Sequence, residues 1–110
     1  MICDRYDTVV VPFPFADIPI LKRRPALVMS GSEFNTLNLS TIVAMITTAK
    51  ASAWPSDVLI KDLASADLPT ACVVRWRLAT IPNSLLVRKL GKLAPLDRLS
   101  CEREFAKILV

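Results

Sequence analysis

The chain has 110 residues, a length that one modest hydrophobic core can stabilise, and 53% of them are apolar. Its formal charge of +4 permits an acidic partner such as a nucleic acid without demanding one. It contains no histidine and only two glycines, which excludes histidine-dependent nucleophile systems and glycine-rich phosphate loops. We expect one domain over residues 1–110, and we interpret the apolar surplus as a core plus a face used in self-association.

The first half of the chain has the pattern of three strands joined by loops. β-branched and aromatic residues predict a first strand over 8–13, followed by a proline-punctuated loop over 14–21. A second strand is predicted over 25–29, directly after three consecutive cations. Turn residues over 30–35 and a polar run to residue 40 lead to a third strand over 41–46.

The second half begins with a short predicted strand over 57–60, a helical turn over 61–68 and a strand over 71–78. A turn over 80–83 precedes a last strand or short helical turn over 85–90, which Gly91 closes. The pattern then changes to a helix over 95–110, and Pro95 and Asp97 suit its start. Its apolar residues form a stripe at three- and four-residue spacing: Leu96, Leu99, Phe105, Ile108 and Leu109.

Several short strands, irregular loops and a terminal helix together predict the fold class. The pattern favours a mainly β protein with a C-terminal helix, built as a small, strongly bent antiparallel sheet or barrel. The three cysteines form no CxxC pair, so we expect reduced thiols and no metal site. The N-terminus contains two acids and no long apolar run, and we expect a cytoplasmic protein without a membrane segment.

The cationic triplet Lys22-Arg23-Arg24 is the first candidate for a working site. Pro25 fixes its own φ and favours extended geometry at Arg24, so the second arginine is presented from a rigid support. A guanidinium can clamp a phosphate through two parallel hydrogen bonds and stabilise charge on its oxygens. The plainer alternative is a surface cation beside a strand. Lys22 and Arg23 are expected to be solvated charges that help to attract a polyanion.

Hydroxyls at strand ends are the second group of candidates. Thr47 and Thr48 at the exit of the third strand can hydrogen-bond a phosphate oxygen or a ribose 2′-hydroxyl, although strands commonly contain threonine for ordinary reasons. Ser30 ends the second strand and is included among the substrate-binding candidates.

A second basic group occupies the last third of the chain. Cations surround Trp76 there, and together they can bind a single strand by stacking and phosphate contact: Arg75, Arg77, Arg88, Lys89 and Lys92. The alternative is that Trp76 belongs to the core or to a dimer interface. Three aspartates are too scattered in sequence to predict a metal site or a carboxylate pair: Asp7, Asp57 and Asp67.

Taken together, several segments resemble the PemK/MazF family of toxins from bacterial toxin–antitoxin modules. Two segments are most specific when they occur together. One is Arg24-Pro25 followed by an apolar run, and the other is Ile46-Thr47 at the end of a strand. The matching segments keep their order and spacing over nearly the whole chain: 6–15, 22–30, 43–47, 73–75 and 85–93. The resemblance implies an SH3-like barrel, a homodimer and a sequence-specific endoribonuclease that acts on single-stranded RNA.

The chemistry implied by the resemblance needs no metal and no cofactor. The ribose 2′-hydroxyl attacks the adjacent phosphate and leaves a 2′,3′-cyclic phosphate and a 5′-hydroxyl. The family's catalytic arginine, which precedes the proline, falls on Arg24, and its catalytic threonine falls on Thr47. Arg23, Thr48 and Arg75 would line the RNA path. A cognate antitoxin would bind as a partly disordered segment along the basic groove of the dimer.

The sequence also departs from the family pattern in one loop. Many members contain Gly-Ser-Glu-Gln before the arginine, whereas residues 17–21 here are largely apolar. Two alternatives share the fold: a CcdB-like toxin that binds DNA gyrase without nuclease activity, and an inactivated barrel that retains its antitoxin-binding groove. CcdB-like action depends on C-terminal residues, whereas the apolar end over 105–110 is more typical of a docked helix.

Overall fold

The computed structural model describes residues 1–13, 22–49 and 53–110; the loop predicted over 14–21, with its apolar segment 17–21, lies outside them. Its strands form one antiparallel sheet in the order β4-β5-β3-β2-β1-β6. The strands are β1 (Asp7–Phe13), β2 (Lys22–Val28), β3 (Ser40–Thr48), β4 (Val58–Leu59), β5 (Cys72–Pro82) and β6 (Arg88–Lys92). The helices are α1 (Ser32–Asn38), α2 (Leu63–Ala66), a 3-10 turn (Asn83–Leu85) and α3 (Pro95–Ile108).

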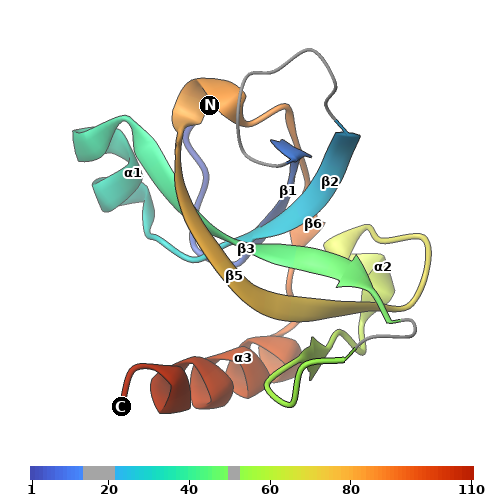
Figure 1. Ribbon diagram of the computed structural model, residues 1–110. Helices are drawn as coiled ribbons and strands as arrows, with labels where there is room; N and C mark the ends of the chain where they lie inside the picture. Colours follow the sequence, from blue (N-terminus) through green and yellow to red (C-terminus); the bar gives the residue numbers. More distant parts are fainter. Residues whose placement is uncertain (14–21, 50–52) are drawn as a thin grey trace.

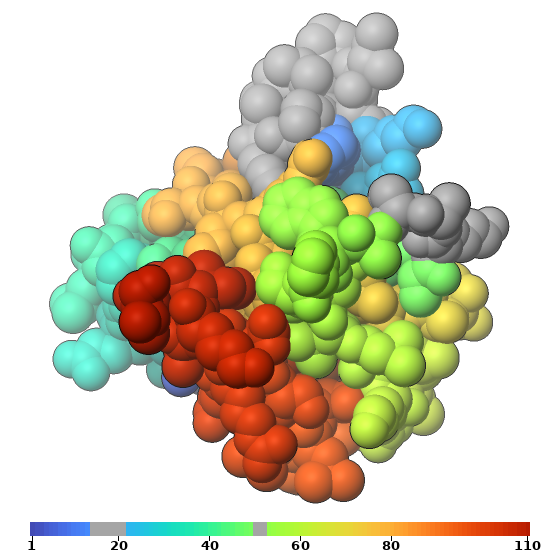
Figure 2. Space-filling view, turned by 60° about the horizontal axis from the view of Figure 1, so that its bottom comes forward, coloured from blue at the N-terminus to red at the C-terminus, as the bar shows by residue number. Residues whose placement is uncertain are grey.

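Figure 1 shows the sheet curled upon itself, with α3 lying below β5. Figure 2 shows α3, in orange and red, beside the green segment that contains β4. The predicted class, a mainly β fold with a bent antiparallel sheet and a C-terminal helix, is confirmed. No helix among the described residues is long and apolar enough to cross a membrane.

The second strand begins earlier than the sequence pattern predicted. β2 already includes the cationic triplet, and Lys22 pairs with Phe13 of β1. The prediction placed these cations before the strand because Pro25 lacks a backbone N–H. The proline is tolerated here because β2 pairs with β3 only over residues 26–28 and is an edge strand on that side from Pro25 backward.

The segment predicted as turn and polar run contains the helix α1. Its serine, threonine and asparagine residues favour caps and turns over helices, and for this reason the sequence pattern predicted no helix there. A buried asparagine holds the helix in place: Asn35 donates from Nδ2 to the Cys3 carbonyl oxygen at 2.9 Å, and Asn83 donates to the Asn35 carbonyl oxygen at 2.8 Å. Similarly, the turn predicted over 80–83 is the end of β5, where Pro82 pairs with Ser40 of β3.

Two hydrophobic clusters cover opposite faces of the curled sheet. One contains Leu27, Ile46, Val74 and Trp76 and extends to Cys101 of α3. The other gathers the alternate strand residues together with residues near the 3-10 turn: Cys3, Val9, Val11, Ala26, Val28, Val43, Ile81 and Leu86. Because successive residues of a strand project to opposite faces, β2 contributes Leu27 to the first cluster and its neighbours to the second.

The helix α3 is docked through one residue of its predicted stripe, Phe105, and through residues outside the stripe. Leu96 is 74% exposed and Leu99 is 47% exposed, so the first part of the stripe does not face the core. The inward residues are Asp97 and Cys101, and Phe105 packs on Trp76 with ring centroids 5.4 Å apart. The Asp97 carboxylate accepts hydrogen bonds from the backbone N–H groups of residues 61 and 62 at 3.0 and 2.9 Å. The end of the chain after Phe105 is exposed, which corrects the expectation of a docked terminus.

The curl is closed where α2 meets β6. The buried Thr8 hydroxyl donates to the Ala66 carbonyl oxygen at 2.8 Å and accepts from the Gly91 N–H at 3.0 Å. A β-carbon at Gly91 would overlap the Ser65 carbonyl oxygen, so only glycine allows the backbones of α2 and β6 to approach this closely. Gly91 therefore lies within β6 and permits closure, rather than ending the strand as predicted.

We predict that Gly91→Ala destabilises the protein because the backbone of α2 must move away from β6. Overpacking of this kind costs about 1–3 kcal/mol in the free energy of unfolding, measured by urea denaturation. Gly31→Ala is the control, since a β-carbon there meets nothing within 4 Å, and it should cost less than about 1 kcal/mol, the loss of a favourable helix N-cap at α1. Equal stability of the two variants would contradict the proposed closure.

Candidate active site

Three paired strands bring the leading candidate residues to one face of the sheet. Ala26 of β2 pairs with Met45 of β3, and Met45 pairs with Arg75 of β5. Directly paired residues of antiparallel strands project to the same side, and so does every second residue along a strand. Arg24 and Thr47, two residues from Ala26 and Met45, therefore project to the same face as Arg75.

A pocket opens on this face where β2 and β3 separate. The pairing of the two strands ends at Ala26 and Met45, whereas β3 remains paired with β5 as far as Thr48 (Figure 1). The pocket has a volume of about 240 Å³ and is lined by Phe13, Arg24, Met45, Ile46, Thr47, Arg75 and Arg77. Arg24, Thr47 and Arg75 are the predicted site residues that the structure brings together there.

An ion pair with Asp57 fixes Arg75 in the pocket wall. Arg75 donates from Nε to Asp57 Oδ1 at 3.1 Å and from Nη2 to Asp57 Oδ2 at 2.8 Å. This is the bidentate geometry that a guanidinium and a carboxylate favour. Both side chains are mostly buried, at 14% and 9% exposed. The hydrogen bonds from Arg75 lower the pKa of Asp57, and the carboxylate in turn raises the pKa of Arg75. Both groups are therefore charged at neutral pH.

The chemistry of the pocket suits a phosphodiester. Three guanidinium groups, those of Arg24, Arg75 and Arg77, line it together with one hydroxyl, that of the half-buried Thr47. Cations and a hydroxyl donor stabilise phosphate oxygens on which negative charge increases during a transfer reaction. Within the described residues there is no group of three or more His, Cys, Asp or Glu side chains that could hold a metal ion.

The remaining predicted cations and hydroxyls lie elsewhere. By strand alternation Lys22 projects to the face of Arg24, but it does not line the pocket. Arg23 and Thr48 project to the opposite face. Arg23 lines a second pocket of about 570 Å³, which Arg88 and residues of α2 also line, and Arg24 borders both pockets.

Ser30 has a structural contact in place of the predicted substrate contact. It is buried next to α1, where its hydroxyl donates to Asn35 Oδ1 and accepts the Ile42 N–H at 2.8 Å. Both hydrogen-bonding capacities of the hydroxyl are therefore used within the fold. Ser30 is also absent from the described lining of the pocket that contains Arg24.

Sequence reasoning missed Phe13, which lines the pocket, and Asp57, which braces it. Phe13 continues the alternation of Val11, so a period of two would have pointed to it. Arg77, which the sequence placed in the second basic group, lines the pocket beside Arg75. No sequence signal pairs Asp57 with Arg75, which is 18 residues away, because the scattered aspartates predict only the lack of a metal site or carboxylate pair.

The thiols are poor candidates for a nucleophile. The three cysteines are unpaired and buried, which confirms the expectation of reduced thiols: Cys3, Cys72 and Cys101. Burial raises the pKa of all of them, and the pKa of Cys101 reaches about 12. A thiol that stays protonated is inert as a nucleophile.

Comparison with known proteins identifies the family. The sequence model of the PemK-like, MazF-like toxins of type II toxin–antitoxin systems matches residues 4–109. The chain belongs to this toxin family. A search of curated proteins found no match.

Solved structures share the fold at low sequence identity. A MazE–MazF crystal structure from Deinococcus radiodurans matches with a TM-score of 0.79 and 17% identity, covering 99% of this chain and 97% of that one. An endoribonuclease from a mycobacterial species matches at 0.76 and 16% identity, over 99% and 92% of the chains. A mycobacterial endoribonuclease in complex with its cognate antitoxin matches at 0.74 and 17% identity, over 98% and 93%. These matches show that the chain has the MazF fold.

We predict that the ion pair of Asp57 and Arg75 contributes a pH-dependent part of folding stability. Its contribution is full above the unfolded pKa of aspartate, about 3.9, and is lost as pH falls through the lower pKa of the folded state. Asp57→Asn should lower the free energy of unfolding by about 1–3 kcal/mol at pH 7, as expected for hydrogen bonds to a charged group.

Urea denaturation of wild type and Asp57→Asn between pH 2 and 7 measures this difference. It should shrink below about pH 4 and vanish at the acid end. Glu33→Gln on the exposed face of α1 is the control and should show a small effect, below about 0.5 kcal/mol, at every pH. A difference that stays constant down to the lowest pH would show that the pair is not the cause.

Proposed function

We propose that this toxin cleaves single-stranded RNA in the pocket between β2 and β3, as a sequence-specific endoribonuclease that inhibits growth. The observation that supports this most directly is that Arg24 of β2 and Thr47 of β3 line the same pocket. The two residues are far apart in the sequence and meet only through the fold. Two of the structures that share its fold are endoribonucleases. Family membership and a phosphate-binding pocket point to the same activity.

The proposed reaction is a transesterification within the substrate. The ribose 2′-oxygen forms a bond to the adjacent phosphorus as the bond from phosphorus to the 5′-oxygen breaks. The 2′-hydroxyl releases its proton to solvent water, Arg24 supplies one to the 5′-oxygen, and solvent then reprotonates Arg24, so the step is balanced without a metal or a cofactor. Because RNA supplies the attacking group, the protein only has to orient it and stabilise the charge on phosphorus. This explains how a chain without histidine can act on RNA.

Each pocket residue has a distinct part in this proposal. Arg24 binds the oxygens of the scissile phosphate as their charge increases, and it donates the proton to the leaving 5′-oxygen. Thr47 donates a hydrogen bond that fixes the orientation of the phosphate. Arg75, which Asp57 holds in place, contacts the phosphate of a neighbouring nucleotide, while Lys22 and Arg23 act only through long-range attraction of RNA. Thr48 is uncharged and projects to the opposite face, so it has no direct part in cleavage.

We further propose that residues 1–110 form one toxin domain, which acts in the cytoplasm as a homodimer, where its RNA substrate and its antitoxin are found. Exposed apolar side chains on α1 and α3 support self-association: Phe34, Leu37, Leu96 and Leu99. Complexes of similar structures with an antitoxin support a cognate antitoxin as the partner. An apolar and acidic segment of that antitoxin fits the larger pocket, where arginines stand among apolar walls.

The two faces of β2 and β3 give a matched test of the site. Arg24→Ala should reduce kcat/KM for RNA cleavage by about 10²- to 10⁴-fold, because the transition state loses its cation and proton donor. Thr47→Val should reduce it by about 10- to 150-fold, the worth of one hydrogen bond to a charged group. Cleavage of a defined single-stranded RNA under single-turnover conditions measures both.

Arg23→Ala and Thr48→Val are the controls, since they remove the same groups from the neighbouring positions on the opposite face. Each should change kcat/KM by less than about tenfold, and all four variants should retain the thermal stability of wild type. Losses as large in the controls as in Arg24→Ala and Thr47→Val would contradict the assignment. A folded wild type that cuts no RNA would favour a gyrase-binding or inactivated toxin instead.

A further inference from the structure

An exposed tryptophan lies beside the pocket and has no part in the site described above. Trp54 is 38% exposed, and the Arg75 and Arg77 guanidinium carbons lie 5.4 and 5.7 Å from the centroid of its ring. Both arginines project from the same face of β5. The ring is therefore in contact with two cations, and more than a third of Trp54 remains available to solvent.

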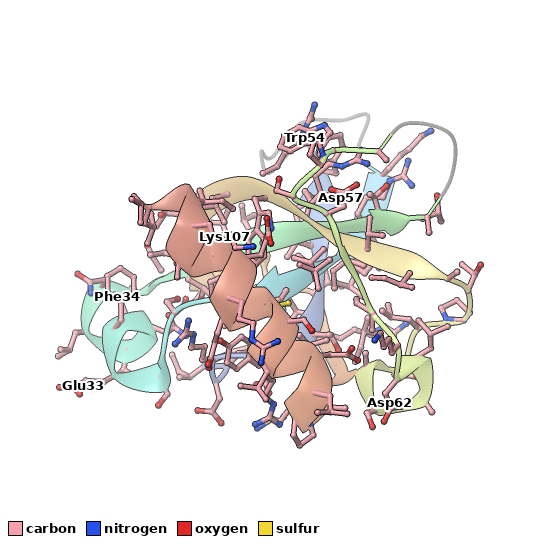
Figure 3. The ribbon with its side chains drawn as sticks, turned by 90° about the horizontal axis from the view of Figure 1, so that it is seen from below. Glu33, Phe34, Trp54, Asp57, Asp62 and Lys107 are labelled. Carbon is pink, nitrogen blue, oxygen red and sulfur yellow. The ribbon has the colours of Figure 1, made fainter. Side chains whose placement is uncertain are left out.

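Hydrogen bonds fix the backbone of the turn that contains Trp54. The backbone N–H of Trp54 donates to Asp57 Oδ2 at 3.0 Å, and the Asp57 N–H donates to the Trp54 carbonyl oxygen at 3.0 Å. Ser56 of the same turn is fixed as well, since Trp76 donates from Nε1 to its carbonyl oxygen at 2.8 Å. Figure 3 shows Trp54 and Asp57 together at one end of the molecule.

The carboxylate of Asp57 thus connects the pocket and the indole. It forms the ion pair with Arg75, which lines the pocket, and it accepts the backbone N–H of Trp54. Arg75 and Arg77 are shared in the same way: they line the pocket and also support the ring. A ligand phosphate in the pocket would therefore be next to an aromatic surface whose position is fixed in advance.

We propose that Trp54 is a stacking platform for one nucleobase of the RNA, adjacent to the nucleotide whose phosphate occupies the pocket. This inference rests on the proposed function and adds a substrate-binding residue to it. An aromatic ring flanked by arginines is the arrangement by which proteins bind single strands, with the ring stacking on a base and the cations contacting phosphates. Trp54 can stack on any base because every base has a π-face. Trp54 therefore binds the strand at one nucleotide, and the pocket binds the phosphate that is cleaved.

A chemical double-mutant cycle tests the contact between Trp54 and a base. A short single-stranded RNA that the wild type cuts is prepared with one abasic nucleotide at each position flanking the cut. At one adjacent position, loss of the base should reduce kcat/KM of the wild type by about 5- to 150-fold. With Trp54→Ala the intact RNA should lose the same factor, and abasic substitution at that position should have no further effect.

Two variants separate stacking from other causes. Trp54→Phe should retain most of the activity because it keeps an aromatic face, whereas Trp54→Leu, of comparable apolarity, should behave like Trp54→Ala. Ile2→Ala is the control, because Ile2 is 49% exposed and is neither among the described residues that line the pocket nor among those proposed for self-association. It should leave cleavage and the abasic profile unchanged. Independent effects of Trp54→Ala and the abasic substitution at every position would overturn the inference while leaving the nuclease activity intact.

Tryptophan fluorescence distinguishes failure of this inference from failure of the proposed function. A defined single-stranded RNA is titrated, whether or not the wild type cuts it, into Arg24→Ala protein with and without the second substitution Trp54→Phe. The emission that Trp54 contributes should be quenched by the intact RNA and less by the same RNA with abasic nucleotides. Quenching without any cleavage by wild type would preserve the inference and reject the nuclease. Cleavage without quenching would reject the stacking role of Trp54 and preserve the nuclease activity. Absence of both cleavage and quenching would reject both claims.

Discussion

The alternation of side chains across three paired strands is the constraint on which the proposed site depends. The register of β2, β3 and β5 places Ala26, Met45 and Arg75 on one line across the sheet. The residues two positions away from this line, Arg24 and Thr47, then project to the same face. A shift of one residue in β2 would replace Arg24 by Arg23 and move the cation to the other side of the sheet. The packing of both hydrophobic clusters opposes that shift, because it would exchange Leu27 and Val28 between the two clusters.

The curl of the sheet turns this face into a pocket. β2 and β3 separate beyond their last pair, and the opening lies between Arg24 and Thr47. Closure of the curl elsewhere depends on the contact of Gly91 with α2. Arg75 cannot move freely in the pocket wall because Asp57 accepts from both Nε and Nη2, along one edge of the guanidinium. A rigid, cationic pocket with one hydroxyl is enough for a reaction in which the substrate contains its own nucleophile.

Much of this could be predicted from local sequence patterns, and the exceptions have tertiary causes. The strands and α3 follow from β-branched runs and from a proline at the helix start, and Arg24 was indicated by the proline after it. The helix α1 was missed because it depends on buried hydrogen bonds of Asn35 to distant segments. Asp57 was missed because its partner Arg75 lies on β5, 18 residues away in the sequence. Ser30 was predicted to bind substrate, but its hydroxyl bonds to Asn35 within the fold. Pairings between distant residues leave no trace in a single sequence.

The central claim is that the 2′-hydroxyl of the RNA is the nucleophile, and removal of this hydroxyl from the substrate tests it most directly. Wild-type protein is incubated with a single-stranded RNA in the presence of a chelator, the cut is mapped, and the RNA is remade with a 2′-deoxy nucleotide at that position. The pocket described above predicts fragments that end in a 2′,3′-cyclic phosphate and a 5′-hydroxyl, and no cut at the deoxy position. Cleavage of the deoxy substrate at an undiminished rate, or fragments ending in a 3′-hydroxyl and a 5′-phosphate, would mean that water is the nucleophile and would contradict the roles given to Arg24 and Thr47.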